Sequence, residues 1–103
     1  MITAVVTFKI PAGTTREQWL AQTKEAAGRF QNMPGLIRKQ FLYSDGLCGG
    51  VYLWETRAAA EACYRGPWRD NVRKASGGNE PDIAWFETPV VVDNECHQVK
   101  VAA

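Results

Sequence analysis

The stretch that decides the fold reads Gly50-Val51-Tyr52-Leu53-Trp54-Glu55. Its β-branched and aromatic residues predict a strand, and successive side chains of a strand point to opposite faces. One face therefore carries Tyr52 and Trp54, and the other carries Val51 and Leu53. A sheet that leaves one face in water alternates apolar with polar residues, which this stretch does not do. The sequence thus predicts a sheet that is covered on both faces.

The segments around this stretch predict three more strands and three helices. Residues 2–10 alternate as a strand with one strongly apolar face does. The other elements are expected at 15–31 (helix), 36–44 (strand), 57–65 (helix), 67–74 (short helix) and 83–87 (strand). The order β-α-β-β-α-β is that of the ferredoxin-like fold, an α+β architecture in which helices cover one face of an antiparallel sheet.

Short polar residues mark where these elements begin and end. Thr14 and Glu17 stand three apart and predict a capping box for the first helix. Thr56 predicts the N-cap of the second helix. Asp45-Gly46 predicts a hairpin turn whose loop continues to Gly50.

Length and charge indicate one domain without a nucleic-acid or membrane partner. The 103 residues carry 12 Lys and Arg against 11 Asp and Glu, a formal net charge of +1. A near-neutral chain lacks the basic surface that nucleic acids require, and no apolar run approaches the roughly 18–20 residues of a membrane span. We expect residues 1–94 to form the domain. Residues 95–103 are expected to form a tail, in which Gln98–Val101 could add an edge strand.

The cysteines and the N-terminus favour a cytoplasmic protein. Cys48, Cys63 and Cys96 are odd in number and widely spaced, which suits thiols in a reducing compartment better than a disulfide framework. The first residues show neither a basic region nor a small-residue cleavage site. We therefore expect a soluble protein of the cytoplasm.

The second apolar face of the sheet needs a cover that the helices, which lie on the first face, cannot provide. The simplest cover is the same face of a second copy, because two-fold pairing is the commonest way to hide an apolar surface. The sequence therefore predicts a homodimer.

Aromatic side chains are the candidates for a ligand pocket between the sheet and the helices. Most aromatic residues of this chain must belong to the core, but some can line such a pocket. The candidates are Phe41, Tyr52, Trp54, Trp68 and Trp85. A pocket of this kind suits a small, flat, mostly apolar ligand that few polar groups orient.

Arg38 is the charged candidate for a catalytic residue. It stands in the middle of an expected strand, between Leu36 and Gln40, where a buried charge would need a partner or a ligand. The alternative is an arginine on an exposed face whose stem packs along apolar surface. Both interpretations stay open at the level of the sequence.

No cofactor or metal is expected. The sequence contains neither a glycine-rich dinucleotide motif nor a P-loop. Cys96 and His97 are adjacent, but two ligands without a third and fourth do not make a metal site. His97 could serve as a general base, although a solvated histidine in the tail is the simpler interpretation.

Four segments resemble a known family. Met33–Phe41, Gly49–Glu55, Ala58–Ala62 and Trp85–Asp93 are similar to the YdhR-like monooxygenases of the dimeric α+β barrel superfamily, which includes the antibiotic-biosynthesis monooxygenases. The resemblance implies a homodimer whose two sheets form a barrel. It also implies a pocket in each subunit between sheet and helices.

The resemblance further implies a function. The better-understood relatives oxidise polycyclic phenols with dioxygen, without metal or flavin, because the electron-rich substrate itself reduces oxygen. This chain would then be a cofactor-independent monooxygenase acting on a small aromatic or polycyclic compound, with Arg38 beside the substrate anion. The Asn-Trp-His set of haem-degrading relatives is not matched, since residues 57–65 contain neither Asn nor His. The alternatives are a non-oxidative barrel that binds or isomerises a small hydrophobic ligand, and a stress-associated binding module.

Overall fold

The computed structural model describes residues 1–102 and contains the elements expected for the ferredoxin-like order. In chain order these are β1 (Ile2–Lys9), α1 (Arg16–Phe30), β2 (Leu36–Leu42), β3 (Leu47–Trp54), α2 (Arg57–Tyr64), α3 (Trp68–Ser76), β4 (Asp82–Glu87), β5 (Val90–Asp93) and β6 (Gln98–Val101). The predicted α+β fold is confirmed.

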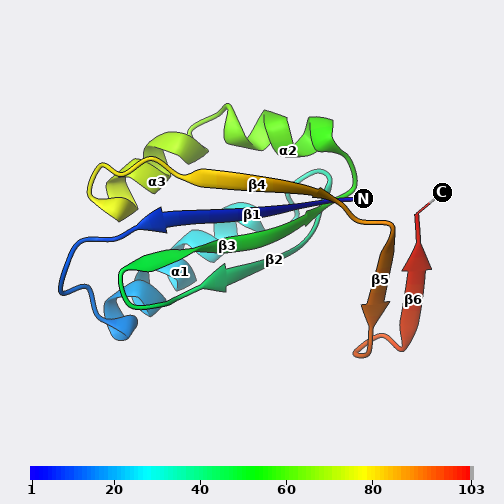
Figure 1. Cartoon of the computed structure of the whole chain (residues 1–103), viewed down its shortest axis with the longest axis horizontal. Helices are drawn as coiled ribbons and strands as arrows, with labels where there is room; N and C mark the ends of the chain where they lie inside the picture. The colour runs from blue at the N-terminus through cyan, green and yellow to red at the C-terminus, as the bar shows by residue number, and fades with distance from the viewer. Residues whose placement is uncertain (103) are drawn as a thin grey trace.

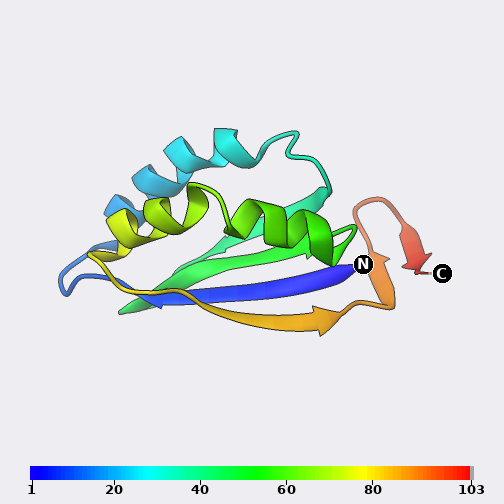
Figure 2. The same ribbon diagram turned by 90° about the horizontal axis from the view of Figure 1, so that it is seen from above.

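The first four strands form one antiparallel sheet in the order β2-β3-β1-β4. The two central strands, β1 and β3, pair along their whole length, with Val6 opposite Gly50. All three helices lie on one face of this sheet, as Figures 1 and 2 show. No helix of the described chain covers the opposite face, which we call the open face.

The core lies between the sheet and the helices and follows the alternation that the sequence predicts. Ala4 and Val6 of β1, with Tyr52 and Trp54 of β3, point toward the helices and are at most 3% exposed. Burying a large apolar side chain stabilises a fold by about 1.5–3 kcal/mol. This layer therefore holds the helices on the sheet.

Helix α1 begins one residue later than the sequence pattern predicts. Its N-cap is Thr15, whose hydroxyl accepts a hydrogen bond from the Gln18 amide at 3.1 Å, while Gln18 Oε1 accepts one from the Thr15 amide at 2.9 Å. The predicted box of Thr14 and Glu17 is wrong. The Thr14 hydroxyl is engaged elsewhere, because it donates to the Pro11 carbonyl oxygen at 2.8 Å.

The connection between β2 and β3 is shorter than the sequence predicts. Strand β3 begins at Leu47, so the turn is confined to residues 43–46 and does not continue to Gly50. Gly49 lies against the backbone of β1, where an added Cβ would stand 1.8 Å from the Val6 carbonyl oxygen. A glycine is therefore needed for these two strands to approach so closely.

A β-bulge in β2 changes which residues face the helices. The register against β3 shifts between Leu36 and Arg38, so that Leu36 lies opposite Trp54 and Lys39 lies opposite Tyr52. Leu36 and Lys39 therefore share the helix-covered face, although an odd number of positions separates them. Arg38 belongs to the open face.

The C-terminal strands form a separate hairpin. Gln98–Val101 is a strand, but it pairs with β5 and not with the four-stranded sheet, and the hairpin stands at the end of that sheet (Figure 1). Asp93 closes the turn, since its Oδ1 accepts hydrogen bonds from the amides of Cys96 and Glu95 at 3.2 and 3.0 Å. These amides lower the pKa of the Asp93 carboxyl.

Candidate functional site

A cavity of about 370 Å³ lies between the sheet, α1 and α3. Small-molecule sites have volumes of roughly 300–1,000 Å³ and walls that combine apolar rings with a few polar groups. The aromatic residues of this wall are Phe8, Trp19, Phe30, Phe41, Tyr52 and Trp68. The cavity therefore matches a small aromatic ligand in size and lining.

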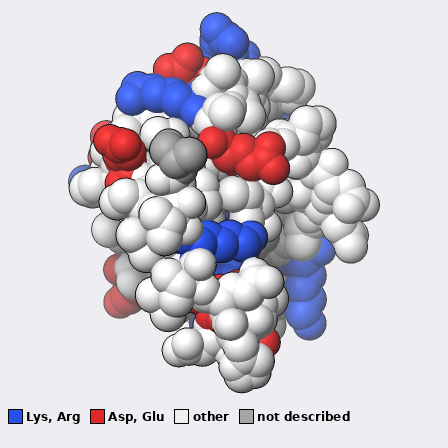
Figure 3. All heavy atoms as spheres, turned by 90° about the vertical axis from the view of Figure 1, so that its right-hand side faces the viewer, with Lys and Arg blue, Asp and Glu red and all other residues white. Residues whose placement is uncertain are grey.

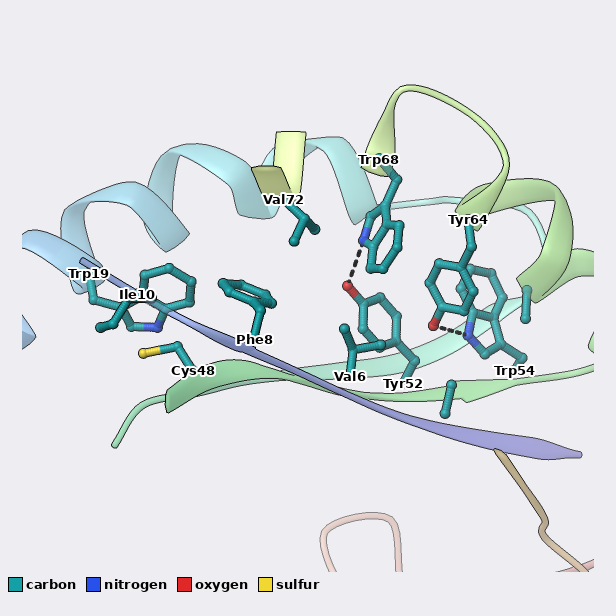
Figure 4. Packing of buried hydrophobic residues seen from close by; sticks show 12 residues of the cluster. Val6, Phe8, Ile10, Trp19, Cys48, Tyr52, Trp54, Tyr64, Trp68 and Val72 are labelled. Atoms are coloured by element: carbon teal, nitrogen blue, oxygen red, sulfur yellow. Dashed lines mark hydrogen bonds between the residues drawn. The ribbon is translucent and has the colours of Figure 1, made fainter. Parts of the chain in front are cut away.

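Tyr52 brings a hydroxyl group into the aromatic layer (Figure 4). Trp68 Nε1 donates a hydrogen bond to the Tyr52 hydroxyl oxygen at 3.0 Å. Burial raises the pKa of Tyr52 far above its ordinary value, so the group stays protonated at neutral pH. Because Trp68 uses an acceptor position of the oxygen, the Tyr52 proton is free to be donated to a ligand.

Lys39 places an amine among the rings of the cavity wall. Its Nζ lies 3.3 Å from the ring centroid of Phe30, 3.9 Å from that of Phe41 and 4.4 Å from that of Tyr52. Removal from water lowers the pKa of Lys39 from 10.5 to about 7, and the nearby Arg29 acts in the same direction. Lys39 can therefore accept or release a proton near neutral pH.

Positive charge exceeds negative charge in the cavity wall. Arg29, Lys39 and Lys74 line it, together with the carboxylate of Glu25. Within residues 1–102, none of the three cations forms an ion pair with a carboxylate within 4.0 Å. An unneutralised positive wall attracts a ligand that carries, or can acquire, negative charge.

The structure brings three of the five predicted aromatic residues into this cavity, namely Phe41, Tyr52 and Trp68. Trp54 is fully buried in the layer beside it. The Trp54 ring stacks on the Tyr52 ring with centroids 6.0 Å apart, and Nε1 donates to the Tyr64 hydroxyl at 3.1 Å (Figure 4). Trp54 therefore supports Tyr52 from behind and does not line the cavity.

Trp85 lies outside this cavity as well. It lines a second pocket on the far side of Tyr64, next to Arg57 of α2. The Arg57 guanidinium carbon lies 4.2 Å from the Trp85 ring centroid, and the Trp85 and Tyr64 rings are 5.7 Å apart. Its role in the structure is to close the other end of the aromatic layer.

Arg38 does not reach the cavity. Its side chain is 47% exposed on the open face, and its Nη2 lies 3.6 Å from Asp93 Oδ2 and 3.8 Å from Glu95 Oε2. Of the two interpretations that the sequence left open, the arginine on an exposed face describes this arrangement. Its partners come from the β5–β6 hairpin, which it joins to β2.

The sequence patterns did not identify Lys39. A usable signal existed, because Lys39 stands two residues from both Ile37 and Phe41 on what reads as an apolar parity. Arg38 shares the face of Leu36 only if the strand is regular. The bulge between Leu36 and Arg38 removes that regularity, so Lys39 and not Arg38 joins the helix-covered face.

The tail residues do not form a metal centre. Among residues 1–102, no three His, Cys, Asp or Glu side chains come together as a metal site requires. Cys96 is exposed, and His97 stands in the hairpin turn with φ of 53°. In the same range, none of the helices has the length and hydropathy needed to cross a membrane.

Comparison with known proteins finds solved structures that share this fold. No protein-family model matches the sequence, and no curated protein matches it. Solved structures do match. SnoaB from Streptomyces nogalater, described as a cofactor-independent oxygenase, superimposes with a TM-score of 0.62 at 15% identity over 84% of this chain and 91% of its own.

Two further neighbours hold ligands. ActVA-Orf6 of Streptomyces coelicolor, a monooxygenase in complex with nanaomycin D, matches with a TM-score of 0.62 at 19% identity over 84% of this chain and 86% of its own. A variant of MhuD with two manganese protoporphyrin IX molecules per active site matches with a TM-score of 0.69 at 20% identity over 91% and 100%. These are proteins of the antibiotic-biosynthesis-monooxygenase type, and at such identities the likeness shows a shared fold. The narrower YdhR-like resemblance stays a prediction.

Proposed function

We propose that the cavity binds a small aromatic or polycyclic phenol and that the protein oxidises it with dioxygen, without a bound cofactor. The observation that carries this proposal is the position of Lys39. Its amine faces an aromatic cavity and lies close to three rings, within reach of proton exchange at neutral pH. An acidic phenol bound there would meet a base and a positive wall at once.

The first step would be the loss of the phenol proton. Neutral Lys39 accepts that proton, and the resulting ammonium group stabilises the phenolate. Cation–π contacts to Phe30 and Phe41 then favour the charged lysine. The Tyr52 hydroxyl can donate a hydrogen bond to the same or a second substrate oxygen. Both groups thus bind the anion more strongly than the neutral phenol, which is what catalysis requires.

Electron balance restricts the substrate. Without a cofactor, all electrons that reduce dioxygen must come from the phenol itself. A phenol conjugated to a CH₂ group can supply them. The CH₂ carbon is oxidised to a carbonyl group while O₂ is reduced, so that CH₂ and O₂ become C=O and H₂O. One oxygen atom enters the product and the other leaves as water, with no external reductant. A hydroxylation that stops at C–OH, and does not reach C=O, would need two further electrons from a reductant. Such a reaction does not fit a protein without a cofactor.

Oxygen uptake with anthrone as the probe tests this proposal. Anthrone combines a conjugated CH₂ group with a phenolic tautomer and a flat ring system. We expect uptake with the wild-type protein and a loss of roughly 10²–10⁴-fold in kcat/KM for Lys39→Met, the range of general-base catalysis. Lys24→Met removes an exposed lysine of α1 and is the matched control. Absence of uptake over a panel of such phenols, or full activity of Lys39→Met, would overturn the proposal.

A non-oxidative function is the second candidate, and the same pair of groups favours it. A neutral amine and a phenolic hydroxyl in one cavity can move a proton beside a carbonyl group, as an isomerase does. Ligand binding that quenches tryptophan fluorescence, together with proton exchange but no oxygen uptake, would favour this candidate. Binding without either reaction would leave a binding module.

We propose further that the functional unit is a homodimer joined through the open face. Phe86 on this face is 56% exposed, and Val51 and Leu53 beside it have no helix over them. Exposed apolar surface of this kind is typical of an interface. Two such sheets packed face to face would form the barrel that the family resemblance implies.

The hairpin carries an exposed apolar surface of its own. Cross-strand pairing of Val90 with Val101 and of Val92 with Val99 puts four valines on one side of it, and each is 49–72% exposed. Figure 3 faces this end of the molecule and shows mostly uncharged atoms between separate charged groups. A lone two-stranded hairpin is marginally stable in water, so a second copy would stabilise it.

Light scattering tests the dimer. We expect a dimer mass at micromolar concentration for the wild-type protein and a monomer for the double variant Leu53→Glu/Phe86→Glu, which introduces charge on the open face. Leu20→Glu, which places the same charge on an exposed position of α1, should remain a dimer. A monomeric wild-type protein would contradict the proposal directly.

A further inference from the structure

We propose that Lys39 is a nucleophilic amine that forms a Schiff base with an aromatic aldehyde or ketone bound in the cavity. This goes beyond the proposed oxidation, because it requires no dioxygen and a different class of ligand. The chain would then hold carbonyl compounds covalently and reversibly.

The geometry leaves the amine free to react. Nζ lies 3.3–4.4 Å from three ring centroids, and within the described chain no carboxylate lies within 4.0 Å of it. A lysine held in an ion pair stays protonated and cannot attack a carbonyl carbon. Rings attract the cation only weakly compared with a carboxylate, so Lys39 can lose its proton.

Two features of the surroundings favour the neutral amine. Desolvation is the larger and Arg29 of α1 adds repulsion, which together bring the pKa of Lys39 to about 7. The charged or titratable groups that face it are Arg29, Tyr52 of β3 and Cys63 of α2. The Cys63 thiol acts in the opposite direction and raises the pKa of Lys39, but desolvation is the larger cause. Burial raises the pKa of the Cys63 thiol itself. Neutral and charged Lys39 are therefore both present near neutral pH.

The reaction is balanced by groups already present. The nitrogen lone pair attacks the carbonyl carbon while the carbonyl oxygen takes a proton, giving a carbinolamine. Loss of water then gives the C=N bond, as solvent protonates the leaving hydroxyl and takes the remaining proton from nitrogen, while the Tyr52 hydroxyl donates a hydrogen bond to the departing oxygen. No oxidant or reductant is consumed. The Trp68 hydrogen bond to the Tyr52 oxygen, 3.0 Å long, keeps that hydroxyl within the cavity wall.

Other lysines lack this combination. Lys9, Lys24 and Lys100 are exposed and show no ring contact in the described chain. Lys74 lines the cavity but is exposed. A carbonyl compound that recognises the cavity should therefore react at Lys39 before it reacts with the surface.

Reductive trapping tests the inference. The protein is incubated with 2-naphthaldehyde and sodium cyanoborohydride under anaerobic conditions at about pH 7, and the intact mass is measured. We expect one fast addition per chain, equal to the aldehyde less one oxygen atom, which peptide mapping places on Lys39. Lys39→Arg should lose the fast phase, and Lys24→Arg should keep it.

Two further measurements use the wild-type protein only, so that they do not depend on whether Lys39→Arg folds correctly. An excess of 2-naphthol, which fills the same space but has no carbonyl group, should slow the fast addition. The rate should rise between about pH 6 and about pH 8 and then level off, as for an amine with a pKa near 7 and unlike a surface lysine. Addition spread evenly over all lysines, or no protection by 2-naphthol, would overturn the inference. Neither result depends on whether the protein consumes oxygen.

Discussion

Two neighbouring basic residues, Arg38 and Lys39, lie on opposite faces of the sheet and have different contacts. Arg38 lies on the open face, 47% exposed, with the carboxylates of Asp93 and Glu95 within 4 Å. Lys39, the next residue, lies on the helix-covered face among three aromatic rings and without a carboxylate partner in the described chain. Arg38 is thus paired with carboxylates, whereas Lys39 contacts aromatic rings in the wall of a cavity.

The difference shows which kind of charge marks a site. Arg38 makes a surface ion pair, an interaction that is weak and common. Burial lowers the pKa of Lys39. Ionisable groups with a shifted pKa in a cavity are typical of functional sites. The helix-covered face is therefore where we expect substitutions to have large effects, and the open face of a single chain is where we expect small ones.

The largest expected effect comes from Trp54 on the covered face. Trp54→Ala removes a fully buried ring that stacks on Tyr52, and should lower the free energy of unfolding by about 3–5 kcal/mol. Phe86→Ala on the open face is the matched comparison and should cost less than about 1 kcal/mol when both variants are measured in the monomeric Leu53→Glu background. Urea titrations monitored by circular dichroism measure both. Equal losses would mean that the two faces do not differ as described.

Lys39→Met sharpens the comparison through pH. Because its pKa falls from 10.5 unfolded to about 7 folded, the unfolded state binds more protons between these values. Burying the ammonium group therefore lowers the free energy of unfolding by its full amount below pH 7. This loss disappears as pH rises toward 10.5. We expect Lys39→Met to be more stable than wild type by several kcal/mol near pH 6, with the difference vanishing only above about pH 10.5.

Arg38→Met, on the open face, is the control for this pH dependence. It also replaces a cation by methionine, but its stability relative to wild type should not change over the same alkaline range. Urea titrations at a series of pH values compare the two variants. A flat difference for Lys39→Met would show that its amine is not removed from water, and would weaken the proposed reactions with it.

Strand alternation was sufficient to predict the fold. Tyr52 and Trp54 on one side of β3, with Val51 and Leu53 on the other, predicted both the helix-covered core and the apolar open face. Alternation works here because β1 and β3 pair without interruption over their full length. Among the predicted pocket residues, the position of Tyr52 followed from the same rule.

Alternation alone does not decide which charged residue belongs to the site. Ile37 and Phe41 place Lys39 on an apolar parity, whereas Leu36 places Arg38 on one. A β-bulge depends on how two strands pair, and nothing in residues 36–42 alone reveals that the register shifts between Leu36 and Arg38. The shift exchanges the faces of Arg38 and Lys39 relative to Leu36. The cavity itself also depends on how α1 and α3 sit on the sheet, which periodicity does not specify.

Two glycine substitutions test how closely β1 and β3, the central strands of the sheet, approach each other. Gly49→Ala places a Cβ 1.8 Å from the Val6 carbonyl oxygen, so β1 and β3 must move apart, at an expected cost of about 1–3 kcal/mol. Gly28→Ala, at an exposed position of α1 with open space around it, should instead stabilise the protein by roughly 0.5–1 kcal/mol. Thermal unfolding of the two variants should shift in opposite directions, and a shared direction would contradict the close approach of these strands.

The smallest effect on ligand binding is expected for Arg38→Ala. Comparing this variant with Lys39→Met shows which of the two neighbouring basic residues binds the ligand. Arg38 lies on the face away from the cavity, so its loss should change the dissociation constant of 2-naphthol by less than about twofold. Lys39→Met should weaken the same binding by at least about tenfold near pH 7 to 8, where the neutral amine can take the naphthol proton and the resulting ammonium group holds the naphtholate. Quenching of tryptophan fluorescence measures both constants, because Trp68 lines the cavity. If Arg38→Ala weakened binding as much as Lys39→Met, the anion would be bound from the open face, and a site assembled between two copies would replace the cavity described above.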